Sequence, residues 1–344
     1  MNGLDVVAAR LDSQKLLTPG FKKAAEVVRW FGAVQAQDFK AAKWALGLRM
    51  RTATDAVIED AFNKGEILRT HVMRPTWHFV APEDIRWLLQ LTGPRVNLKC
   101  GPNYRKFELD AALFKRSNKV LTKLLQGGKC LIRSELKSAL NRVQIDASDP
   151  IRLVHILLRA ELDGVICSGP RPGKQFTYAL LEERAPAAKI LKREEALAEL
   201  TRRYFTSHGP ATIQDFVWWS GLTVEDAKRG IASIEAEFEK AVVDEKVYWH
   251  ARAPRTTQPK SVHLLPAFDE YFVAYKDRRI AVAPSLSTWD VLGPTFLIDG
   301  VATGTWKRTN SGSIDFNLSR TLKKPEKLSL NEAANRYSTF SSPK

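Results

Sequence analysis

The sequence has few cysteines, no low-complexity segment and no long hydrophobic run. Cys100, Cys130 and Cys167 are its three cysteines in 344 residues. They are too few and too scattered for a disulfide framework, and their spacing fits no metal site. No apolar run approaches the roughly 20 residues that a membrane-spanning helix needs, and the N-terminus lacks the pattern of a signal peptide. We therefore expect a cytoplasmic, nucleoid-associated protein with reduced thiols, no metal, no cofactor and no membrane partner.

What the sequence has in excess is positive charge. Lys and Arg number 53 against 38 Asp and Glu, a formal net charge of +15, and the basic residues are spread along the chain. A basic surface favours a polyphosphate partner such as nucleic acid, although a soluble protein can be basic without one. A hydrophobic content of 44% is enough for two to four domains with their own cores.

One local pattern of three helices followed by two strands occurs three times. The clearest copy has a helix at about 150–165 and strands at 165–168 and 176–180, and the other copies span 21–80 and 208–249. Helix-turn-helix followed by a hairpin is a winged helix, and a repeated unit of this kind indicates an architecture better than a single motif does. The pattern predicts an α+β fold of three tandem winged helix-turn-helix units with a C-terminal small β-sheet or barrel domain. The predicted domains are 1–102, 103–190, 191–252 and 253–344.

Short β runs fill the C-terminal part of the chain, and Asp299-Gly300 is a strong hairpin signal between two of them. A last helix is predicted at about 329–340. The predicted strands are 262–265, 272–275, 279–283, 295–298, 301–306 and 313–316.

Two glutamines two positions apart are the first candidate catalytic residues. In an extended segment Gln35 and Gln37 point the same way, so their amides converge. An amide cannot titrate usefully, but its carbonyl oxygen can orient a water and stabilise developing positive charge. The alternative is that Asp38 caps the next helix and the glutamines are ordinary helix-end residues.

Five segments, in this order along nearly the whole chain, resemble the AlkZ-like, or YcaQ-type, winged-helix DNA glycosylases. They are Val34–Asp38, His71–His78, Gly209–Leu222, Leu265–Tyr271 and Asp299–Trp306. The resemblance implies three tandem winged helices that form a concave basic surface, with a β-domain at the C-terminal end. It also implies a catalytic Gln-x-Gln or Gln-x-Asp motif. Gln35 and Gln37 match the Gln-x-Gln form, which resembles the crosslink-repair branch, and Asp38 lies one place beyond the acid of the other subgroup.

The chemistry agrees with two amides and no obvious acid. An N7- or N3-alkylated purine already carries positive charge, so it leaves without protonation, and the site need only position water and stabilise charge. No lysine stands out for a Schiff base. We therefore predict a monomeric, monofunctional DNA glycosylase that hydrolyses the N-glycosidic bond of cationic N7-alkylated purines in double-stranded DNA, including bulky adducts or interstrand crosslinks.

Three basic segments are candidate DNA contacts. Arg74, Thr76 and His78 share one face of the first wing, and a half-buried strand with satisfied polar groups is the alternative. Arg171 and Lys174 are at the tip of the second wing, where a basic turn usually contacts phosphate. The resemblance implies that a hairpin of the β-domain approaches the minor groove. The residues of the basic turn that could do so are Lys276, Arg278 and Arg279.

Other residues have simpler interpretations. Adjacent Asp269 and Glu270 are predicted to be turn and strand-end charges, Trp218 and Trp219 to pack in a core, and His155 to lie in a core or an interface. The rival function is a non-catalytic winged-helix DNA-binding or regulatory protein, or an architectural DNA protein. A regulator presents polar and basic residues on its recognition helix. The third helix of the first copy is acidic at 55–62 and that of the second is apolar at 151–158, which disfavours sequence reading.

Overall fold

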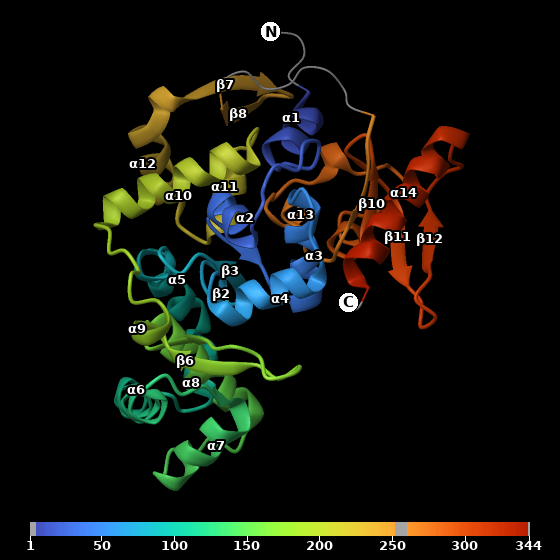
Figure 1. The fold of residues 1–344 in the computed structure, drawn as a ribbon. Coiled ribbons are helices and arrows are strands. Elements are labelled where there is room, and N and C mark those ends of the chain that lie inside the picture. The colour runs from blue at the N-terminus through green and yellow to red at the C-terminus, as the bar shows by residue number, and fades with distance from the viewer. Residues whose placement is uncertain (1–4, 252–259, 343–344) are drawn as a thin grey trace. The chain divides into compact units, whose positions relative to one another are not determined.

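The computed structural model describes residues 5–251 and 260–342, whose course is shown in Figure 1. Two compact units divide the chain. The first unit contains Met1–Glu59, Ala198–Trp219 and Thr223–Lys344, and the second contains Asp60–Leu197 and Ser220–Leu222. Each unit combines α-helices with small antiparallel sheets. None of the described helices is long and apolar enough to cross a membrane.

The second unit is a helical core with two hairpins. Its long helices are α5 (Ile85–Lys106), α6 (Ala111–Leu125), α7 (Arg133–Arg142) and α8 (Pro150–Leu162). Asp149 fixes the start of α8, because its carboxylate accepts from the backbone N–H groups of Ile151 and Arg152 and Pro150 occupies the first turn. The apolar side of α8 then packs against α5 and α6.

The strands of the second unit follow the predicted pattern. β2 (Leu68–His71) pairs with β3 (Trp77–Val80), and β4 (Leu131–Ile132), β5 (Ile166–Ser168) and β6 (Thr177–Leu180) form a sheet of order β4-β6-β5. A short helix, α9 (Leu181–Arg184), follows β6. The predicted helix at 150–165 and the strands at 165–168 and 176–180 are confirmed to within a few residues.

The first unit begins with α1 (Val6–Ser13), α2 (Ala24–Phe31), β1 (Val34–Gln35) and α3 (Phe39–Arg49). Further along the chain it contains α11 (Ile213–Ser220), α12 (Val224–Ile234) and the hairpin of β7 (Phe238–Val243) and β8 (Lys246–Ala251). The chain passes between the units within α4 (Asp55–Lys64), near the start of α10 (Arg193–His208) and on either side of Ser220–Leu222.

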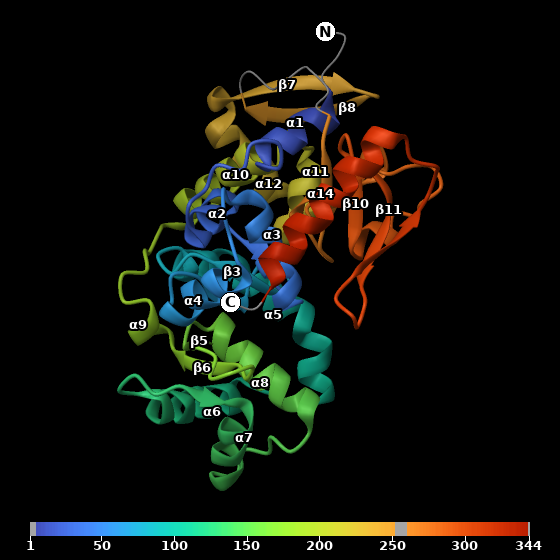
Figure 2. The ribbon, with the colours of Figure 1, turned by 45° about the vertical axis from the view of Figure 1, so that its right-hand side comes forward.

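The C-terminal sheet of the first unit has the order β12-β11-β10-β9. Its strands are β9 (Val262–Leu265), β10 (Thr295–Ile298), β11 (Val301–Arg308) and β12 (Ile314–Leu318). Asp299 and Gly300 both have positive φ, at 51° and 82°, as a tight hairpin turn requires, so this prediction is confirmed. α14 (Lys324–Ser341) lies against β9, and its Tyr337 ring packs edge-on against Trp306. Figure 2 shows α14 beside the sheet that contains β10 and β11.

Two predicted strands of this region are wrong. Residues 270–273 form the short helix α13 (Glu270–Val273), and Arg279–Ala281 form a 3-10 turn. The Asp269 carboxylate caps α13 by accepting from the backbone N–H of Tyr271. All four residues of α13 are buried, and a short apolar run buried on every side does not distinguish helix from strand. In the second unit, α5 continues to Lys106 through Pro94 and Pro102. The predicted boundary at 252/253 lies outside the described residues, and the four-domain division remains a prediction.

Candidate functional site

The Gln35–Asp38 segment joins β1 to α3 in the first unit. Gln35 is 8% exposed, Ala36 is fully buried and Gln37 is exposed. Asp38 accepts a hydrogen bond of 3.0 Å from the backbone N–H of Ala41 and is the N-cap of α3, as predicted. The capping role of Asp38 therefore coexists with a glutamine at the surface two residues from a nearly buried one.

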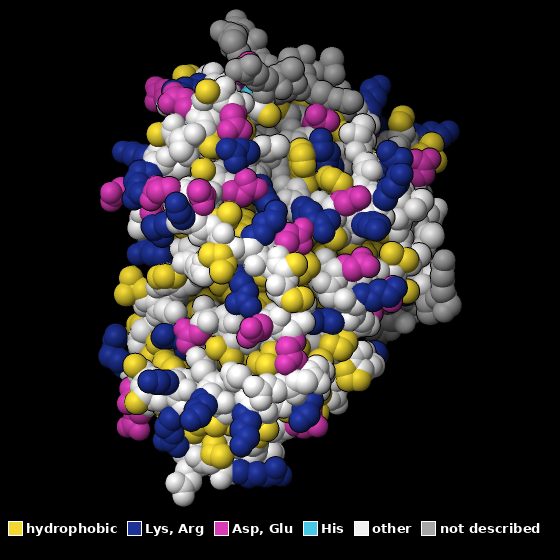
Figure 3. Space-filling view, turned by 60° about the vertical axis from the view of Figure 1, so that its left-hand side comes forward, with side chains coloured by type: hydrophobic (Ala, Val, Ile, Leu, Met, Phe, Trp, Pro, Cys, Tyr) yellow, Lys and Arg dark blue, Asp and Glu magenta, His cyan; other side chains and the backbone are white. Residues whose placement is uncertain are grey.

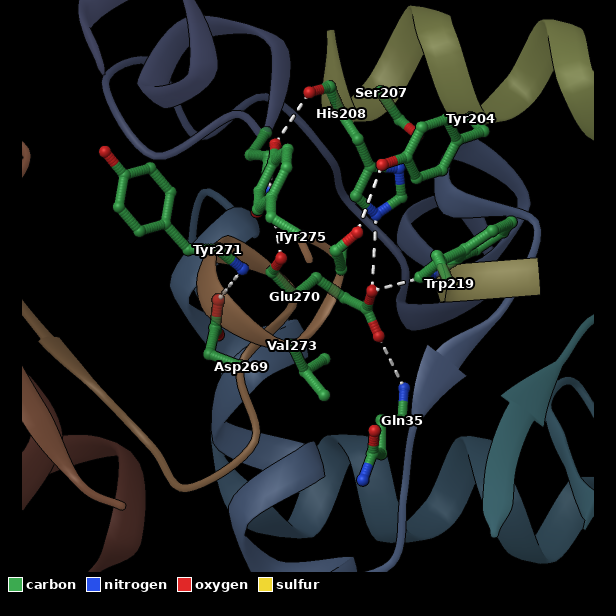
Figure 4. Close-up of polar contacts among 12 residues, drawn as sticks. Gln35, Tyr204, Ser207, His208, Trp219, Asp269, Glu270, Tyr271, Val273 and Tyr275 are labelled. Carbon is green, nitrogen blue, oxygen red and sulfur yellow. Dashed lines mark hydrogen bonds and ion pairs between the residues drawn. The ribbon is translucent and has the colours of Figure 1, made fainter. Parts of the chain in front are cut away.

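A buried carboxylate fixes the backbone of this segment. The N–H of Gln35 donates to Glu270 Oε1 over 2.7 Å, across 235 residues of sequence. Glu270 itself is 0% exposed and begins α13. Figure 4 shows the Gln35 side chain pointing away from the Glu270 carboxylate, so Glu270 holds the main chain and leaves the amide directed elsewhere.

The second oxygen of Glu270 is held by two ring N–H groups. Trp219 Nε1 lies 2.9 Å and His208 Nε2 lies 3.2 Å from Glu270 Oε2 (Figure 4). Burial lowers the pKa of His208, and the hydrogen bond and charge of Glu270 oppose that shift. A buried acid with partners on both oxygens stabilises one geometry, because an unpaired buried charge is strongly unfavourable.

Asp269 faces a different partner. Both of its oxygens bind the Arg49 guanidinium, at 2.8 and 2.9 Å, with both side chains almost fully buried. Arg49 Nη2 also donates to Gln14 Oε1. The two adjacent acids at the start of α13 point to different sides. Asp269 therefore binds α3 through Arg49, and Glu270 binds β1 through the N–H of Gln35. The prediction that Asp269 and Glu270 are turn and strand-end charges is therefore wrong.

Lys43, the buried one of the two lysines of α3, is bound by two acids. The Lys43 ammonium lies 2.7 Å from Asp55 and 2.6 Å from Glu59, and its side chain is 6% exposed. An ammonium that is buried and bound by two carboxylates is a poor nucleophile.

In the second unit, the candidate DNA contacts on the first hairpin, β2–β3, differ in their exposure. His78 is fully buried, with Nδ1 2.9 Å from the carbonyl of Thr76 and Nε2 3.4 Å from Arg74 Nη2. His78 therefore cannot be a surface DNA contact in this structure, because its ring is enclosed by its own hairpin. Arg74 and Thr76 are partly exposed.

The second hairpin separates its two basic residues in the same way. Arg171 Nη2 donates to the carbonyl of Lys174 over 2.8 Å, and its guanidinium lies 4.4 Å from the ring centre of Phe176. Arg171 shapes the turn, whereas Lys174 is exposed.

The predicted basic turn at 276–279 follows α13 and is not a β-hairpin. Lys276 and Arg279 are exposed, and Arg279 binds Asp277, whose pKa is held well below its usual range chiefly by that hydrogen bond. Arg278 is buried, donates from Nε to the carbonyl of Phe272 and lies over the Trp218 ring. The position of Arg278 rules out a direct DNA contact in this structure.

Positive charge on the surface is dispersed. Figure 3 shows Lys and Arg side chains over much of one face, with Asp and Glu among them. Among residues 5–251 and 260–342, no group of His, Cys, Asp and Glu could hold a metal ion.

Comparison with known proteins shows which family the chain belongs to. The family model for DNA glycosylase AlkZ-like proteins matches residues 28–340. The chain belongs to the AlkZ-like DNA glycosylase family. This membership confirms the resemblance and makes the chain a hydrolase of N-glycosyl bonds with DNA as its partner.

Two comparisons from Streptomyces sahachiroi extend over the length of this AlkZ-like glycosylase. An "Interstrand DNA cross-link repair glycosylase" is 25% identical over 337 residues, covering 88% of this chain and 86% of the relative. The solved structure of the DNA glycosylase AlkZ matches with a TM-score of 0.81 and 21% identity, covering 98% of this chain and 95% of that one. The structural match shows a shared mixed helix-and-sheet fold.

Sequence reasoning missed Glu270 as a functional candidate of this AlkZ-like glycosylase. Glu270 lies within one of the segments that carry the resemblance, but nothing local distinguishes it from its neighbour Asp269. Only the fold brings it to the backbone of Gln35.

Proposed function

We propose that this AlkZ-like glycosylase is a monofunctional enzyme for cationic N7-alkylated purines in double-stranded DNA, including bulky adducts and interstrand crosslinks. Gln35 and Gln37 are its catalytic residues. The observation that carries the proposal is the exposed Gln37 two residues from Gln35, on a main chain fixed by the buried Glu270. A fixed main chain presents an amide without further ordering, and such preorganisation is how positioned dipoles accelerate a reaction.

The carboxylates next to the motif are engaged elsewhere. Asp38 caps α3, and both oxygens of Glu270 have N–H partners in the interior. A neutral purine needs an acid to leave, whereas an N7-alkylated purine is already cationic. The proposal therefore assigns charge stabilisation and water placement to the two amides, and it makes Glu270 a positioning residue that acts through Gln35.

Hydrolysis without a lyase step fits the one buried lysine beside the motif in sequence. Lys43 is held by Asp55 and Glu59, so it is unsuited to form a Schiff base. Borohydride trapping with an abasic product should give no covalent complex.

The proposed architecture is three tandem winged helices. The central copy has the most complete set of elements, since α6, β4, α7 and α8 are followed by β5 and β6, and the three strands form the β4-β6-β5 sheet. The proposed DNA contacts are Arg74, Thr76, Lys174, Lys276 and Arg279, while the buried or bound His78, Arg171 and Arg278 support the segments that present them. The crosslink substrate is supported by the printed name of the Streptomyces relative.

The test is release of base from duplexes that carry N7-methylguanine or a nitrogen-mustard crosslink, measured as alkali-labile sites on a gel. Gln37→Ala should lower single-turnover release by about 10- to 100-fold or more and leave duplex binding nearly intact. Gln126→Ala, a change at an exposed glutamine of the second unit, is the matched control. Equal release by Gln37→Ala and wild type would remove the motif from the mechanism, and tight binding with no release by wild type would favour a non-catalytic DNA-binding protein.

A further inference from the structure

The first unit contains a groove that neither glutamine lines. Its volume is about 870 Å³, and its walls come from the start of α11, the β7–β8 hairpin and the segment after α13. Five basic and two acidic side chains line it. The basic residues are Lys240, Lys246, Lys276, Arg278 and Arg279.

The charge of this basic groove is only partly compensated. Asp277 is shared by Lys246 and Arg279, at 2.8 and 2.7 Å, and Lys240 forms an ion pair with Glu235, which does not line the groove. Lys276 is exposed and has no ion pair among the described residues. The remaining positive charge suits an anionic ligand, and several cations along one groove suit a chain of phosphates.

Apolar and aromatic residues also line the groove, together with the polar Thr212, Gln214 and Thr288. Ile213, Val247, Tyr248 and Trp249 contribute to the groove, and Lys240 lies 4.5 Å from the ring centre of Trp249. A phosphate track alone needs no apolar surface. Sugars and unstacked bases do, which is why proteins that bind single strands combine a basic groove with aromatic side chains.

An exposed tryptophan lies next in sequence to the groove. Thr288 lines the groove, and Trp289 is 75% exposed. The turn that carries Trp289 is ordered, because Ser287 and Asp290 exchange hydrogen bonds of 2.9 and 3.1 Å. The exposed Trp289 ring provides a flat surface on which an unpaired base can stack.

We propose that this groove binds an unpaired DNA strand, with phosphates on Lys240, Lys276 and Arg279 and a base stacked on Trp289. The proposal rests on DNA as the partner under the proposed function. It adds a second ligand class, single-stranded DNA, to the damaged duplex. A glycosylase with such a site would hold a strand that has separated from its complement beside a lesion.

The experiment is fluorescence anisotropy of the full chain with labelled dT15 and with a blunt duplex of the same length, over a series of salt concentrations. Wild type should bind dT15. Trp289→Ala should weaken dT15 binding by about tenfold with an unchanged salt slope, because stacking is lost but no phosphate contact is. Trp289→Phe should retain most of the affinity.

The charge variants complete the test. Lys240→Glu with Lys276→Glu should weaken dT15 binding and reduce the salt slope by about 1.4, which corresponds to two phosphate contacts on a single strand. Lys115→Glu with Lys119→Glu on α6 is the charge-matched control, and Ile190→Ala, at a side chain 74% exposed, is the apolar one. Both controls should leave dT15 binding unchanged.

Three results would overturn the proposal. They are no dT15 binding by wild type, equal dT15 binding by wild type and Trp289→Ala, or dT15 binding that the charge variants leave unchanged. Base release from alkylated duplex, measured in parallel, keeps the proposed function separate. Release that survives in wild type while dT15 binding fails would reject the groove alone, and dT15 binding without release would reject the catalytic assignment alone.

Discussion

Each unit of the chain contains a buried glutamate that binds a histidine ring and a backbone N–H of a candidate segment. In the first unit Glu270 binds His208 and the N–H of Gln35. In the second unit Glu161 binds the ring of His71 and, over 3.3 Å, the N–H of the same residue. Both acids are almost fully excluded from water.

The two carboxylates differ in how much of the chain they connect. Glu270 joins α13 to three segments, through His208, Trp219 and Gln35. Glu161 binds one residue of β2, His71. The His71 ring also contacts the Trp77 ring in a tilted arrangement, with 4.3 Å between the ring centres. The difference shows that a buried carboxylate can either hold several distant segments together, as Glu270 does, or stabilise a single hairpin, as Glu161 does.

The largest difference between the two units is expected when each acid is replaced by alanine. Glu270→Ala leaves three buried N–H groups without an acceptor and should lower the opening free energy of the Gln35 segment by about 3–5 kcal/mol. Glu161→Ala should destabilise the β2–β3 hairpin by about 1–3 kcal/mol. Hydrogen exchange of peptides over 34–40 and 68–80 measures both. Equal losses in the two variants would contradict the unequal connectivity.

The next largest effect is expected from a fall in pH, which should destabilise the first unit through His263. His263, on β9 of the first unit, has a pKa lowered to about 4 by burial first and then by Arg336 and Arg49. The unfolded histidine takes up a proton near pH 6.5 but the folded one does not, so stability present above pH 6.5 is lost as pH falls toward 4. This loss is about 3 kcal/mol.

The measurement is unfolding of the wild type and of His263→Gln between pH 7 and 4. The variant should lose less stability across this range, because it has no imidazole to protonate at position 263. Parallel pH profiles for the two proteins would exclude His263 as the cause.

Conservative substitution of the two acids by glutamine should change base release to different extents. Glu270→Gln keeps the shape but replaces one acceptor oxygen by a donor, so the Gln35 segment shifts and base release should fall by about tenfold while duplex affinity changes little. Glu161→Gln should leave release within about twofold. A fall in kcat rather than a rise in KM distinguishes positioning from lost binding. A Glu270→Gln enzyme with wild-type turnover would show that the carboxylate serves stability alone.

The smallest effect is expected at the tip of the second hairpin. Lys174→Ala removes one exposed charge, so duplex affinity should fall a few-fold and the salt slope should fall by about 0.9. Arg171→Ala should instead loosen the turn, because it removes the hydrogen bond to the carbonyl of Lys174. Anisotropy titrations over a range of salt concentrations check both, and an unchanged slope for Lys174→Ala would remove it from the contact surface.

Local sequence patterns predicted the elements that have local causes. The start of α8 near Pro150, the Asp38 cap of α3 and the Asp299-Gly300 hairpin were all recognisable, because caps and tight turns depend on adjacent residues. The predicted strands at 272–275 and 279–283 failed because both runs lie where tertiary packing overrides a local preference.

Side-chain exposure was beyond the reach of the sequence. Alternation along a strand placed Arg74, Thr76 and His78 on one face, but the structure encloses His78 within the turn that carries Arg74. Arg278 was likewise indistinguishable from Arg279 in the sequence, yet one lies against Trp218 and the other in solvent.

The sequence by itself determined the family and the motif, since short segments in a fixed order are a property of the chain alone. It also determined the excess of basic residues that suits DNA. Only the tertiary structure decided that Glu270 supports Gln35, because the two residues are 235 positions apart and a hydrogen bond depends on distance in space. For the same reason, only the fold decided which cations remain at the surface.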